Sequence, residues 1–406
     1  MNKQDKKVPT LRFKGFTNDW EQRKLGEIGI IKSGIGFPTS QQGGAEGTPF
    51  YKVSDMNKPG NELVMKSSSN YVSNRQINDN HWKPIEKTPA VIFAKVGAAL
   101  MLNRKRLVNQ SFLIDNNTMS YSFSNSWDTI FGYTLFLTLN LPKYAQTGAL
   151  PSFNAKDIQN IKVSLPLKNE QHAIGELMAK VSNIVTLQQR KLDLLKQLKK
   201  GLLQKMFADK GSKRPILRFE GFSNDWEQRK LGEISSTFSG GTPSASNKNY
   251  YGGEIPFIRS AEINQNSTQL YLTKDGLNNS SAKLVKKGTL LYALYGATSG
   301  EVGIAQIDGA INQAIMAIDL NNEDTYFVKS WLEKNKGRII STYLQGGQGN
   351  LSAKLIKKLV ISLPKIKEQI QISSLISRID ILLTLQQRKI TKYNEIKKSL
   401  LQQMFI

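Results

Sequence analysis

The sequence predicts an α+β protein with two globular, β-rich units joined by two long antiparallel helices in a pseudo-two-fold arrangement. Three observations support this fold class. One segment is repeated near the start of each half, a second is repeated in a proline-free helical stretch at the end of each half, and strand-length apolar runs lie between them. Repeats of this kind indicate duplicated structural units, so the chain is interpreted as two tandem copies of one unit.

The first repeat opens each half of the chain. It consists of LRFKGFTNDWEQRKLGEIG from Leu11 and LRFEGFSNDWEQRKLGEIS from Leu217, with sixteen of nineteen positions identical. The residues that follow each copy differ much more. We therefore expect the repeated segment to be a framework element that anchors each unit to the helices. What distinguishes the two units should lie in the residues that differ after it.

The middle of each half is predicted to be β-rich. Apolar runs such as AVIFAKV, TLLYALY and KLVISLP have strand length, and Gly, Asn, Ser and Pro separate them. The two middles still align, and we expect a twisted sheet with long loops that differ between the copies. The aligned segments are Thr48–Asn57 with Ile255–Asn264, Thr88–Ala98 with Lys287–Ala297, and Asn109-Gln110 with Asn312-Gln313.

Each half ends in a long predicted helix. Thirteen of the twenty-two residues from Thr186 to Phe207 recur from Thr384 to Phe405. Each helix would be about 55 Å long at 1.5 Å per residue. Apolar residues follow one heptad frame, so the two helices are expected to pack on each other. The apolar positions of the predicted helix-helix seam are Ile174, Leu177, Val181, Ile184, Leu195, Leu198 and Leu202 in the first helix and Ile372, Leu375, Ile379, Leu382, Tyr393, Ile396 and Leu400 in the second.

The heptad frame is interrupted at the same place in both helices. Gln188 and Gln386 occupy seam positions inside the repeated hexapeptide TLQQRK. Polar groups in a seam cost stability but can fix the register of a helix pair. One hypothesis is that they set the register and so the distance between the globular units. The alternative is a solvated crossing point at which the helices diverge.

The repeats divide the chain into four predicted parts. Residues 1–166 form a first globular domain, residues 167–210 a central helix and linker, residues 211–364 a second globular domain, and residues 365–406 a distal helix. The polar stretch ADKGSKRP at residues 208–215 is typical of a connection between structural units.

The charge of the chain indicates a polyanionic partner. Lys and Arg number 56 against 32 Asp and Glu, which gives a net charge of +24 and a pI near 9.8. Such an excess attracts polyanions over long distances, and a pI above about 9 is typical of nucleic-acid-binding domains. The other interpretation is a protein that is merely rich in lysine. Composition alone does not separate DNA, RNA and an anionic membrane as partners.

Composition and motifs argue against several classes of protein. The chain has no cysteine and only two histidines, His81 and His172, so disulfides and thiolate or histidine-rich metal centres are not expected. Neither a signal peptide nor an apolar run long enough to cross a membrane occurs, and we expect a soluble, cytoplasmic protein. No Walker A loop, three-glycine dinucleotide fingerprint or Asn/Asp-Pro-Pro-aromatic motif is present. We therefore expect no catalytic residue and no metal site in this chain.

The class of function that remains is recognition of another molecule. Two basic globular units on a rigid spacer, with loops that diverge between the units, are suited to reading duplex DNA at two places. Contacts on one face of the duplex would lie about one helical turn, roughly 34 Å, apart. A spacer of the predicted helix length could hold that separation.

The chain resembles the specificity (S) subunits of type I restriction-modification systems over essentially its whole length. The resemblance rests on the doubled segments Asp19–Ile28 and Asp225–Ile234, on Ser239–Ser244 (SGGTPS), on Gly296–Gly300 (GATSG), and on the two Ser-Leu-Pro strands that precede the long helices. The first half departs from the pattern, because it has SGIGFPTS from Ser33 and GAALM from Gly97 at the matching places.

The resemblance implies a function and its partners. Each middle would be a target recognition domain that reads one half of a split, asymmetric DNA sequence. The helices would dock two methyltransferase (M) subunits and set the spacer length. The complex would methylate adenine N6 with S-adenosylmethionine held by the M subunits, and with restriction (R) subunits it would cleave DNA using ATP and Mg. This chain would hold no cofactor and supply no catalysis.

The candidate DNA-contacting residues follow from the chemistry of DNA recognition. Small Ser/Thr/Gly loops let backbone N–H groups approach phosphates, Arg or Lys can bind guanine in bidentate fashion, and Asn or Gln can bind adenine. Lys52 and Arg259, which follow the paired Pro-Phe strands, are the leading pair. The other candidates are Ser33, Gly34, Thr39, Ser40, Lys95, Arg104, Lys105, Arg106, Asn109 and Gln110 in the first half and Ser239, Gly240, Gly241, Thr242, Ser244, Gly296, Thr298, Ser299, Asn312, Gln313, Gln345, Gln348 and Asn350 in the second.

Two other functions fit the same residues. A stand-alone sequence-specific DNA-binding regulator would bind its target without an M subunit. A structural or RNA-binding scaffold would show no preference for a duplex sequence.

Overall fold

The chain forms two compact units in the computed structural model, which describes residues 8–146, 150–209, 211–344 and 350–406. Unit 1 comprises residues 1–188 and 389–406, and unit 2 comprises residues 189–388. The two long helices, α6 (Lys168–Met206) and α10 (Ile366–Gln403), therefore contribute one end to each unit. The predicted α+β class, with two repeated units and two long helices, is confirmed.

Unit 1 contains three small sheets. A four-stranded antiparallel sheet has the order β2-β8-β5-β6, a three-stranded sheet has the order β4-β3-β7, and β1 pairs with β9. The strands are β1 (Glu21–Lys24), β2 (Gly29–Ser33), β3 (Thr48–Tyr51), β4 (Tyr71–Val72), β5 (Ala90–Ala94), β6 (Lys105–Val108), β7 (Leu113–Ile114), β8 (Thr118–Phe123) and β9 (Lys162–Leu165). The helices are α1 (Leu25–Ile28), η1 (Thr39–Gln41), η2 (Val53–Asn57), α2 (Asn74–Asp79), α3 (Gly97–Met101), α4 (Thr129–Thr138), η3 (Leu141–Tyr144) and α5 (Ala155–Gln159).

Unit 2 repeats this topology with one additional strand, β14. Its sheets have the orders β11-β18-β15-β16, β13-β12-β17-β14 and β10-β19. The strands are β10 (Glu227–Lys230), β11 (Ser235–Ser239), β12 (Tyr251–Ile258), β13 (Tyr271–Leu272), β14 (Lys283–Val285), β15 (Leu290–Ala293), β16 (Val302–Ile304), β17 (Gly309–Ile311), β18 (Ile315–Leu320) and β19 (Val360–Leu363). The helices are η4 (Leu231–Glu233), η5 (Lys248–Tyr250), η6 (Ser260–Glu262), α7 (Lys274–Asn278), η7 (Gly296–Thr298), α8 (Thr325–Leu344) and α9 (Ala353–Lys357).

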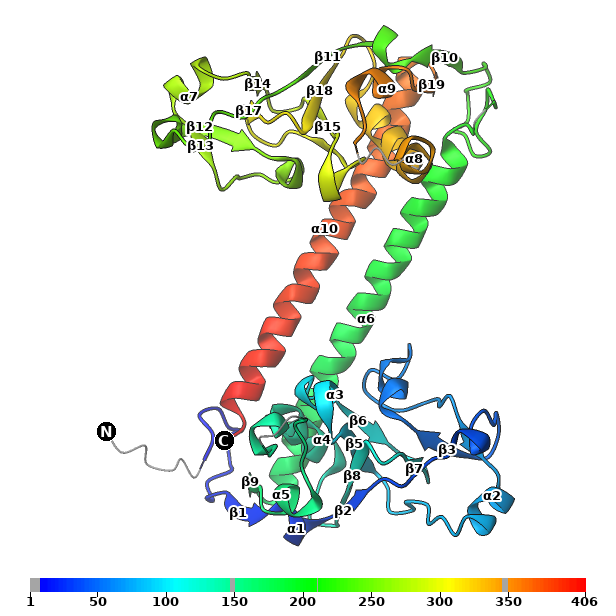
Figure 1. Cartoon of the computed structure of the whole chain (residues 1–406), viewed down its shortest axis with the longest axis vertical. Helices are drawn as coiled ribbons and strands as arrows, with labels where there is room; N and C mark the ends of the chain where they lie inside the picture. Colours follow the sequence, from blue (N-terminus) through cyan, green and yellow to red (C-terminus); the bar gives the residue numbers. More distant parts are fainter. Residues whose placement is uncertain (1–7, 147–149, 210, 345–349) are drawn as a thin grey trace. The chain divides into compact units, whose positions relative to one another are not determined.

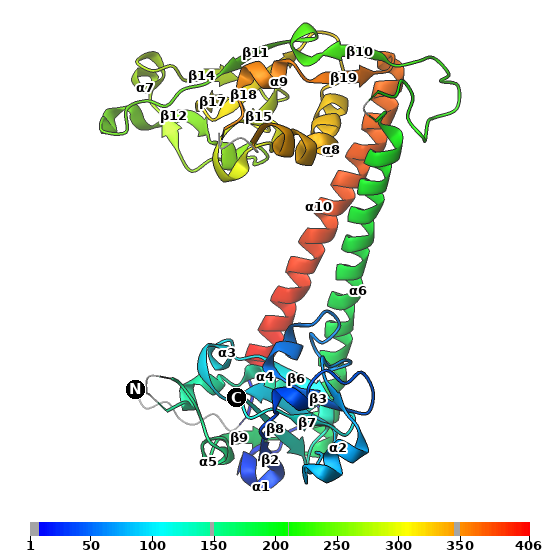
Figure 2. The same ribbon diagram turned by 45° about the vertical axis from the view of Figure 1, so that its right-hand side comes forward.

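β5 in unit 1 and β15 in unit 2 are inner strands of four-stranded sheets. Both strands are buried on both faces, which explains their continuous apolar sequences. In β15, Leu290 and Tyr292 pack in the cluster that contains α8 and the first turns of α10, whereas Leu291 and Ala293 pack toward the sheet that contains β12. The same alternation occurs in β5 of unit 1. In unit 2, the sheet that contains β12 lies on the side away from α10 (Figures 1 and 2). The sheet that contains β15 therefore separates the helices from the sheet that contains β12.

The repeated segment forms a two-stranded framework sheet with the end of its own unit. β1 pairs antiparallel with β9, so that Glu21 lies opposite Leu165 and Lys24 opposite Lys162. β10 pairs with β19 in the same register. The first and last strands of each unit are thus hydrogen-bonded to one another, and the long helix begins directly after the last strand. In the structure, the repeated segment therefore joins the start of each unit to its end.

A buried ion pair fixes the segment before each framework strand to the first turn of the long helix. Arg12 donates from Nε and Nη2 to the two carboxylate oxygens of Glu170, at 2.6 and 2.7 Å. In unit 2, Arg218 makes the same two bonds to Glu368, at 2.7 and 2.8 Å. Both glutamates are 1% exposed. Glu368, next to Arg218, raises the pKa of that guanidinium by hydrogen bonding, so the arginine stays charged at neutral pH.

The end of a long helix closes each unit from the other side. The N–H of Leu11 donates to the carbonyl of Gln403, and the N–H of Leu217 donates to that of Lys205. Phe405 then packs on Trp20 and Phe131 in unit 1. Phe207 packs on Phe327, the ring neighbour of Trp226, in unit 2. Within each unit, therefore, the start of one long helix lies beside the end of the other, which makes them antiparallel there.

The structure contradicts the predicted helix seam at four positions. Leu198 is 51% exposed, and Ile184, Leu382 and Ile396 are also exposed, so these four residues do not line the seam. The next residue along the chain is less exposed in each case, because Val185, Lys199, Leu383 and Lys397 are half-buried. The cause is a second apolar stripe on each helix, one residue out of phase, which gives a competing heptad frame. Ile174, Ile372, Ile379 and Gln386 are buried.

A charged cluster occupies the inward face in unit 2. Lys199 of α6 lies 2.8 Å from Asp380 of α10 and 2.5 Å from Glu333 of α8. Lys329 of α8 lies 3.1 Å from Glu333, and the hydroxyl of Tyr326 donates to Asp380. Burial works to lower the pKa of Lys199, but its hydrogen bonds to the two carboxylates raise it above the ordinary value. The cluster therefore connects α8 to both long helices within this unit.

Among the helices that the structure describes, none has an apolar stretch that would reach across a membrane.

Replacing Ile376 should test the observed helix frame. Ile376 is fully buried in the core of unit 2, so Ile376→Ala should lower the free energy of unfolding by about 2–5 kcal/mol. Ile381 lies on the same helix and is 59% exposed, so Ile381→Ala should change it by less than about 0.5 kcal/mol. Urea unfolding followed by circular dichroism measures both. Equal losses for the two variants would contradict the frame.

Candidate nucleic-acid interface

Some of the candidate residues lie at one edge of each unit, where several strands end. In unit 1, Ser33 at the end of β2 pairs with Met119, and Ala94 at the end of β5 pairs with Thr118 at the start of β8. The end of β3 reaches the same place, because the N–H of Asp115 donates to the carbonyl of Tyr51. We call this place the strand-end edge. In unit 1 it carries the candidates Ser33, Gly34, Lys52 and Lys95.

The strand-end edge of unit 2 is built by the same register. Ser239 of β11 pairs with Met316, Ala293 of β15 pairs with Ile315, and Ile258 of β12 lies beside Ile311 of β17. The loops that follow these strands therefore meet. They contain the candidates Gly240, Gly241, Thr242, Arg259, Gly296, Thr298, Asn312 and Gln313.

The first glycine of each edge is required by backbone packing. A Cβ at Gly34 would lie 1.8 Å from the carbonyl oxygen of Asp115, and a Cβ at Gly240 would lie 1.8 Å from that of Ile311. No other residue fits at these two positions, because the obstructing atoms belong to the backbone. The backbone at the end of β7 or β17 can approach so closely only at glycine. These glycines hold the edge together, which is a different role from the phosphate approach expected for them.

A buried carboxylate organises the loop that carries each leading basic candidate. Asp55 is fully buried and accepts from the N–H of Lys52 at 2.8 Å and from the N–H of Ser69 at 2.8 Å. Glu262 does the same in unit 2, where it accepts from the N–H of Arg259 at 3.1 Å and from Thr268 Oγ1 at 3.0 Å. The acidic residue in the aligned sequence motif is thus a structural element of the loop.

The two basic side chains are held differently. Arg259 donates to both carboxylate oxygens of Glu262 and, at 3.0 Å, to Gln269, and its side chain remains 40% exposed. Lys52 donates to Gln42 Oε1 at 3.2 Å. Burial acts to raise the pKa of Glu262, but hydrogen bonds from Arg259, Gln269 and Thr268 lower it to about 2. The guanidinium is therefore oriented by a permanent anion, whereas the lysine is not.

The structure corrects the alignment of one candidate pair. Asn312 and Gln313 follow β17 and precede β18, and their counterparts in unit 1 are Asp115 and Asn116, between β7 and β8. Asn109 and Gln110 follow β6, whose last residue pairs with the first residue of β5, so they lie away from the strand-end edge. The exposed Asn116 and Asn117 are edge residues that the sequence reasoning missed. The sequence feature that would have identified them is the alignment of IDNN at residues 114–117 with INQA at residues 311–314.

The last loop of each unit also reaches this edge. Val96 bridges Ser152 in unit 1, and Tyr295 bridges Asn350 in unit 2. Gly97 and Gly296 have φ angles of +69° and +73° at the matching turn, a region that favours glycine. Ser239, Tyr295 and Asn350 line a cavity of about 400 Å³ in unit 2. Candidate Asn350 is thus brought to the edge, whereas Gln345 and Gln348 lie outside the described residues.

Three candidates are held inside the protein. Lys105 is 2% exposed and donates to Asn103 and to the carbonyl of Leu139; burial lowers its pKa to about 8. Ser299 is buried and donates to the carbonyl of Leu294. The guanidinium of Arg106 donates hydrogen bonds to the carbonyls of Met56 and Lys105. As DNA contacts, Lys105 and Ser299 are wrong, because both are buried and Lys105 already satisfies its charged group.

The remaining candidates have exposed or local positions. Arg104 hydrogen-bonds Asn57, Thr242 donates to Gln313, and the hydroxyls of Ser244 and Ser246 lie 2.8 Å apart. Thr39 and Ser40 lie exposed in η1. Among the residues that the structure describes, no group of three or more His, Cys, Asp or Glu side chains could hold a metal ion.

The geometry defines a duplicated protein in which two units share one framework and differ at their strand-end edges. The family model described as "Type I restriction modification DNA specificity domain" matches residues 17–197 and again residues 223–398. The chain therefore belongs to this family, as the resemblance in its sequence indicates.

Individual relatives agree with this assignment. The chain is 26% identical over 283 residues to a putative type I restriction enzyme MjaX specificity subunit of Methanocaldococcus jannaschii, which covers 66% of this chain and 64% of the relative. It is 29% identical over 194 residues to the MjaIX specificity subunit of the same organism, covering 45% of this chain and 43% of that one. The matches thus span less than two thirds of the length of these curated relatives.

Solved structures share the fold. The S subunit of a type I restriction-modification system from M. genitalium has a TM-score of 0.66 at 15% identity, covering 98% of this chain and 99% of that chain. A chain from a solved type I restriction-modification assembly has a TM-score of 0.58 at 16% identity, covering 95% and 97%.

Acid titration should reveal the role of Glu262. Its pKa in the folded state, about 2, is below the ordinary value of about 4.3, so the ionised carboxylate stabilises the fold above about pH 5. This contribution is lost as the pH falls toward about 2. The difference in free energy of unfolding between the wild type and Glu262→Gln should therefore narrow by about 3 kcal/mol over that range. Glu254→Gln, at an exposed position, is the control, and a pH-independent difference for Glu262→Gln would contradict this role.

Proposed function

We propose that this chain is the DNA specificity subunit of a type I restriction-modification complex, in which the strand-end edge of each unit reads one half of a split duplex target. The observation that supports this most is the pattern of likeness and difference. The family match covers both units, and their frameworks share register and ion pairs. The residues at the two edges differ in type, with lysines in unit 1 and Arg259 with Gln313 in unit 2.

The chemistry of each edge suits direct reading of bases. Arg can bind guanine through O6 and N7, and Asn or Gln can bind adenine through N6 and N7. Unit 2 offers Arg259, Gln313 and Asn350 on loops that follow adjacent strands, and unit 1 offers Lys52, Lys95, Asn116 and Asn117. Because these side chains differ between the units, the two half-sites would differ in sequence. The net charge of +24 would supply the attraction to phosphates.

The long helices would dock two methyltransferase (M) subunits. Support comes from the outer stripe, which we define as the exposed residues Ile184, Leu187 and Ile396 in unit 1 and Leu194, Leu198, Leu382 and Leu385 in unit 2. Three pairs of these residues occupy matching positions in the two helices. Exposed apolar stripes on soluble proteins mark protein interaction sites. A stripe that occurs twice suits a partner that binds twice.

The chemistry of the complex would lie in its other subunits. The M subunits would hold S-adenosylmethionine for methylation of adenine N6, and restriction (R) subunits would use ATP and Mg for cleavage. This chain would determine which DNA sequence the complex binds and would supply no catalytic group.

Replacing Arg259 should change one half of the recognised sequence. When the chain is co-expressed with its M subunit, Arg259→Ala should relax or abolish recognition of the half-site read by unit 2, because a bidentate contact contributes about 1–3 kcal/mol of discrimination. The half-site read by unit 1 should stay unchanged. Sequencing of N6-methyladenine in host DNA measures both halves at once.

The controls for Arg259→Ala separate specificity from folding. Lys274→Ala removes an exposed cation at the start of α7, away from the edge, and should leave the methylated motif unchanged. Co-purification of the M subunit with the Arg259→Ala chain shows that the complex still assembles. An unaltered two-part motif in that variant would rule out Arg259 as a base-reading residue.

A charge in the outer stripe should weaken M-subunit binding. Leu385 is 48% exposed, so Leu385→Glu should leave the fold intact but reduce affinity for the M subunit at least tenfold, because a carboxylate would be buried at the interface. Gln387→Glu adds the same charge on the opposite side of α10 and serves as the control. Analytical ultracentrifugation measures both affinities. Equal affinity for the two variants would argue against docking on this stripe.

A further inference from the structure

The framework strands keep exposed residues identical in both units without a structural reason. Trp20, Leu25 and Ile28 and their counterparts are buried, so their repetition follows from packing. Glu21 and Glu227 instead expose 71% and 70% of their side chains, and Gln22 and Gln228 are also exposed. Substitutions at such positions usually change stability by less than about 0.5 kcal/mol. Their identity, in units whose middles have diverged, indicates an interaction that both units share.

The charge arrangement at this place is also the same in both units. Arg23 lies 3.3 Å from Glu21 and 3.1 Å from Glu27. Arg229 lies 3.4 Å from Glu227 and 3.6 Å from Glu233. We call these residues (Glu21, Gln22, Arg23 and Glu27 in unit 1; Glu227, Gln228, Arg229 and Glu233 in unit 2) the framework face. Each arginine faces two carboxylates, so the four residues of each framework face carry one net negative charge although the chain as a whole carries +24.

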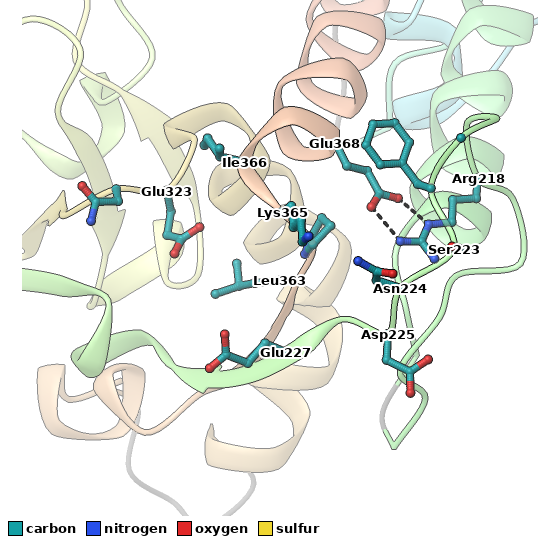
Figure 3. Close-up of a pocket in the computed structure, with 14 residues that line it drawn as sticks. Arg218, Ser223, Asn224, Asp225, Glu227, Glu323, Leu363, Lys365, Ile366 and Glu368 are labelled. Carbon is teal, nitrogen blue, oxygen red and sulfur yellow. Dashed lines mark hydrogen bonds and ion pairs between the residues drawn. The ribbon is translucent and has the colours of Figure 1, made fainter.

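In unit 2 the framework face borders a groove of about 620 Å³. Figure 3 shows its lining: Glu227 comes from β10, Glu323 from the turn before α8, and Ile366 from the start of α10. The ion pair of Arg218 with Glu368 forms one wall. Ile366 is 43% exposed, so the groove combines carboxylates with apolar surface. Unit 1 has Glu21 and the exposed Leu167 near the matching positions.

We propose that the framework face and its groove form a second docking area for the same protein partner, occupied once per unit. The lining has four carboxylates against the two cations Arg218 and Lys365, so it fits a partner segment that carries basic and apolar side chains better than it fits DNA. This proposal rests on the proposed function, in which the partner present twice is the M subunit. The partner then contacts the framework strand of a unit in addition to the outer stripe of the helices. Because the partner would dock at the framework, the residues of the strand-end edge could differ between the two units without affecting that docking.

Charge reversal in one unit at a time tests the proposal. The full chain is co-expressed with its M subunit, and native mass spectrometry counts the M subunits bound. Glu227→Lys should reduce the count from two to one, Glu21→Lys should do the same, and the double variant should bind none. Glu254→Lys places the same reversal on an exposed residue of β12, outside the groove, and should keep two. Thermal melts of the free chains should agree within about 2 °C, which follows from the exposure of both residues.

Each other outcome overturns a different statement. If the double variant retains two M subunits, the framework face is not a docking area, while the proposed function stands. If the count is unchanged but DNA affinity changes, the face contacts DNA and the class of partner is wrong. If the wild type binds no M subunit although DNA binding is specific, the proposed function fails, and this proposal fails with it.

Discussion

The buried Arg–Glu pair is the interaction on which the rest of each unit depends. Arg12 with Glu170, and Arg218 with Glu368, connect the segment before a framework strand to the first turn of a long helix. A carboxylate that is 1% exposed is tolerated because a guanidinium satisfies both of its oxygens. Removing either partner would leave an unpaired charge in the protein, at a cost of about 3–5 kcal/mol. The pair therefore determines where the helix leaves the unit.

The closed framework explains how the two edges can diverge. β1 with β9, and β10 with β19, join the ends of each unit, while the end of a long helix caps the aromatic core beside them. Everything between these strands is a long insertion whose ends are already fixed. Loops at the strand-end edge can then change without altering the helices. The extra strand β14 of unit 2 is an example of such a change.

The sequence predicts the parts of this architecture that depend on local pattern. Doubled segments and proline-free apolar repeats are sufficient for two units, two helices and β-rich middles. The pairing of Glu21 with Leu165 could not be predicted, because strands so far apart in sequence leave no periodic signal. The helix frame was ambiguous, since Leu198 and Lys199 both fit a heptad and the apolar residue is the exposed one.

Some of the candidate residues lie together in the structure, and the errors in the candidate set have physical causes. Gly240, Arg259 and Gln313 meet at one edge because they follow strands whose register aligns. Lys105 was included because lysine can contact DNA, but its side chain is buried and its ammonium group donates to Asn103 and to a carbonyl. Asn109 was matched by letters, whereas the strand order matches Asp115 to Asn312. The order of the strands, and not the similarity of residue types, gives the correct correspondence between the two units.

The two units also differ where α4 and α8 meet the long helices. In unit 2, Lys199 lies on the inward face and is neutralised by Asp380 and Glu333. The corresponding lysine in unit 1 is Lys397, and the residues at the other two positions are Ser182 and Leu137. Burial lowers the pKa of Lys397, whereas the carboxylates raise that of Lys199. One framework thus supports an ionic junction in unit 2 and holds a partly desolvated lysine in unit 1. The duplicated scaffold therefore tolerates differences in its helical junction as well as in its recognition edge.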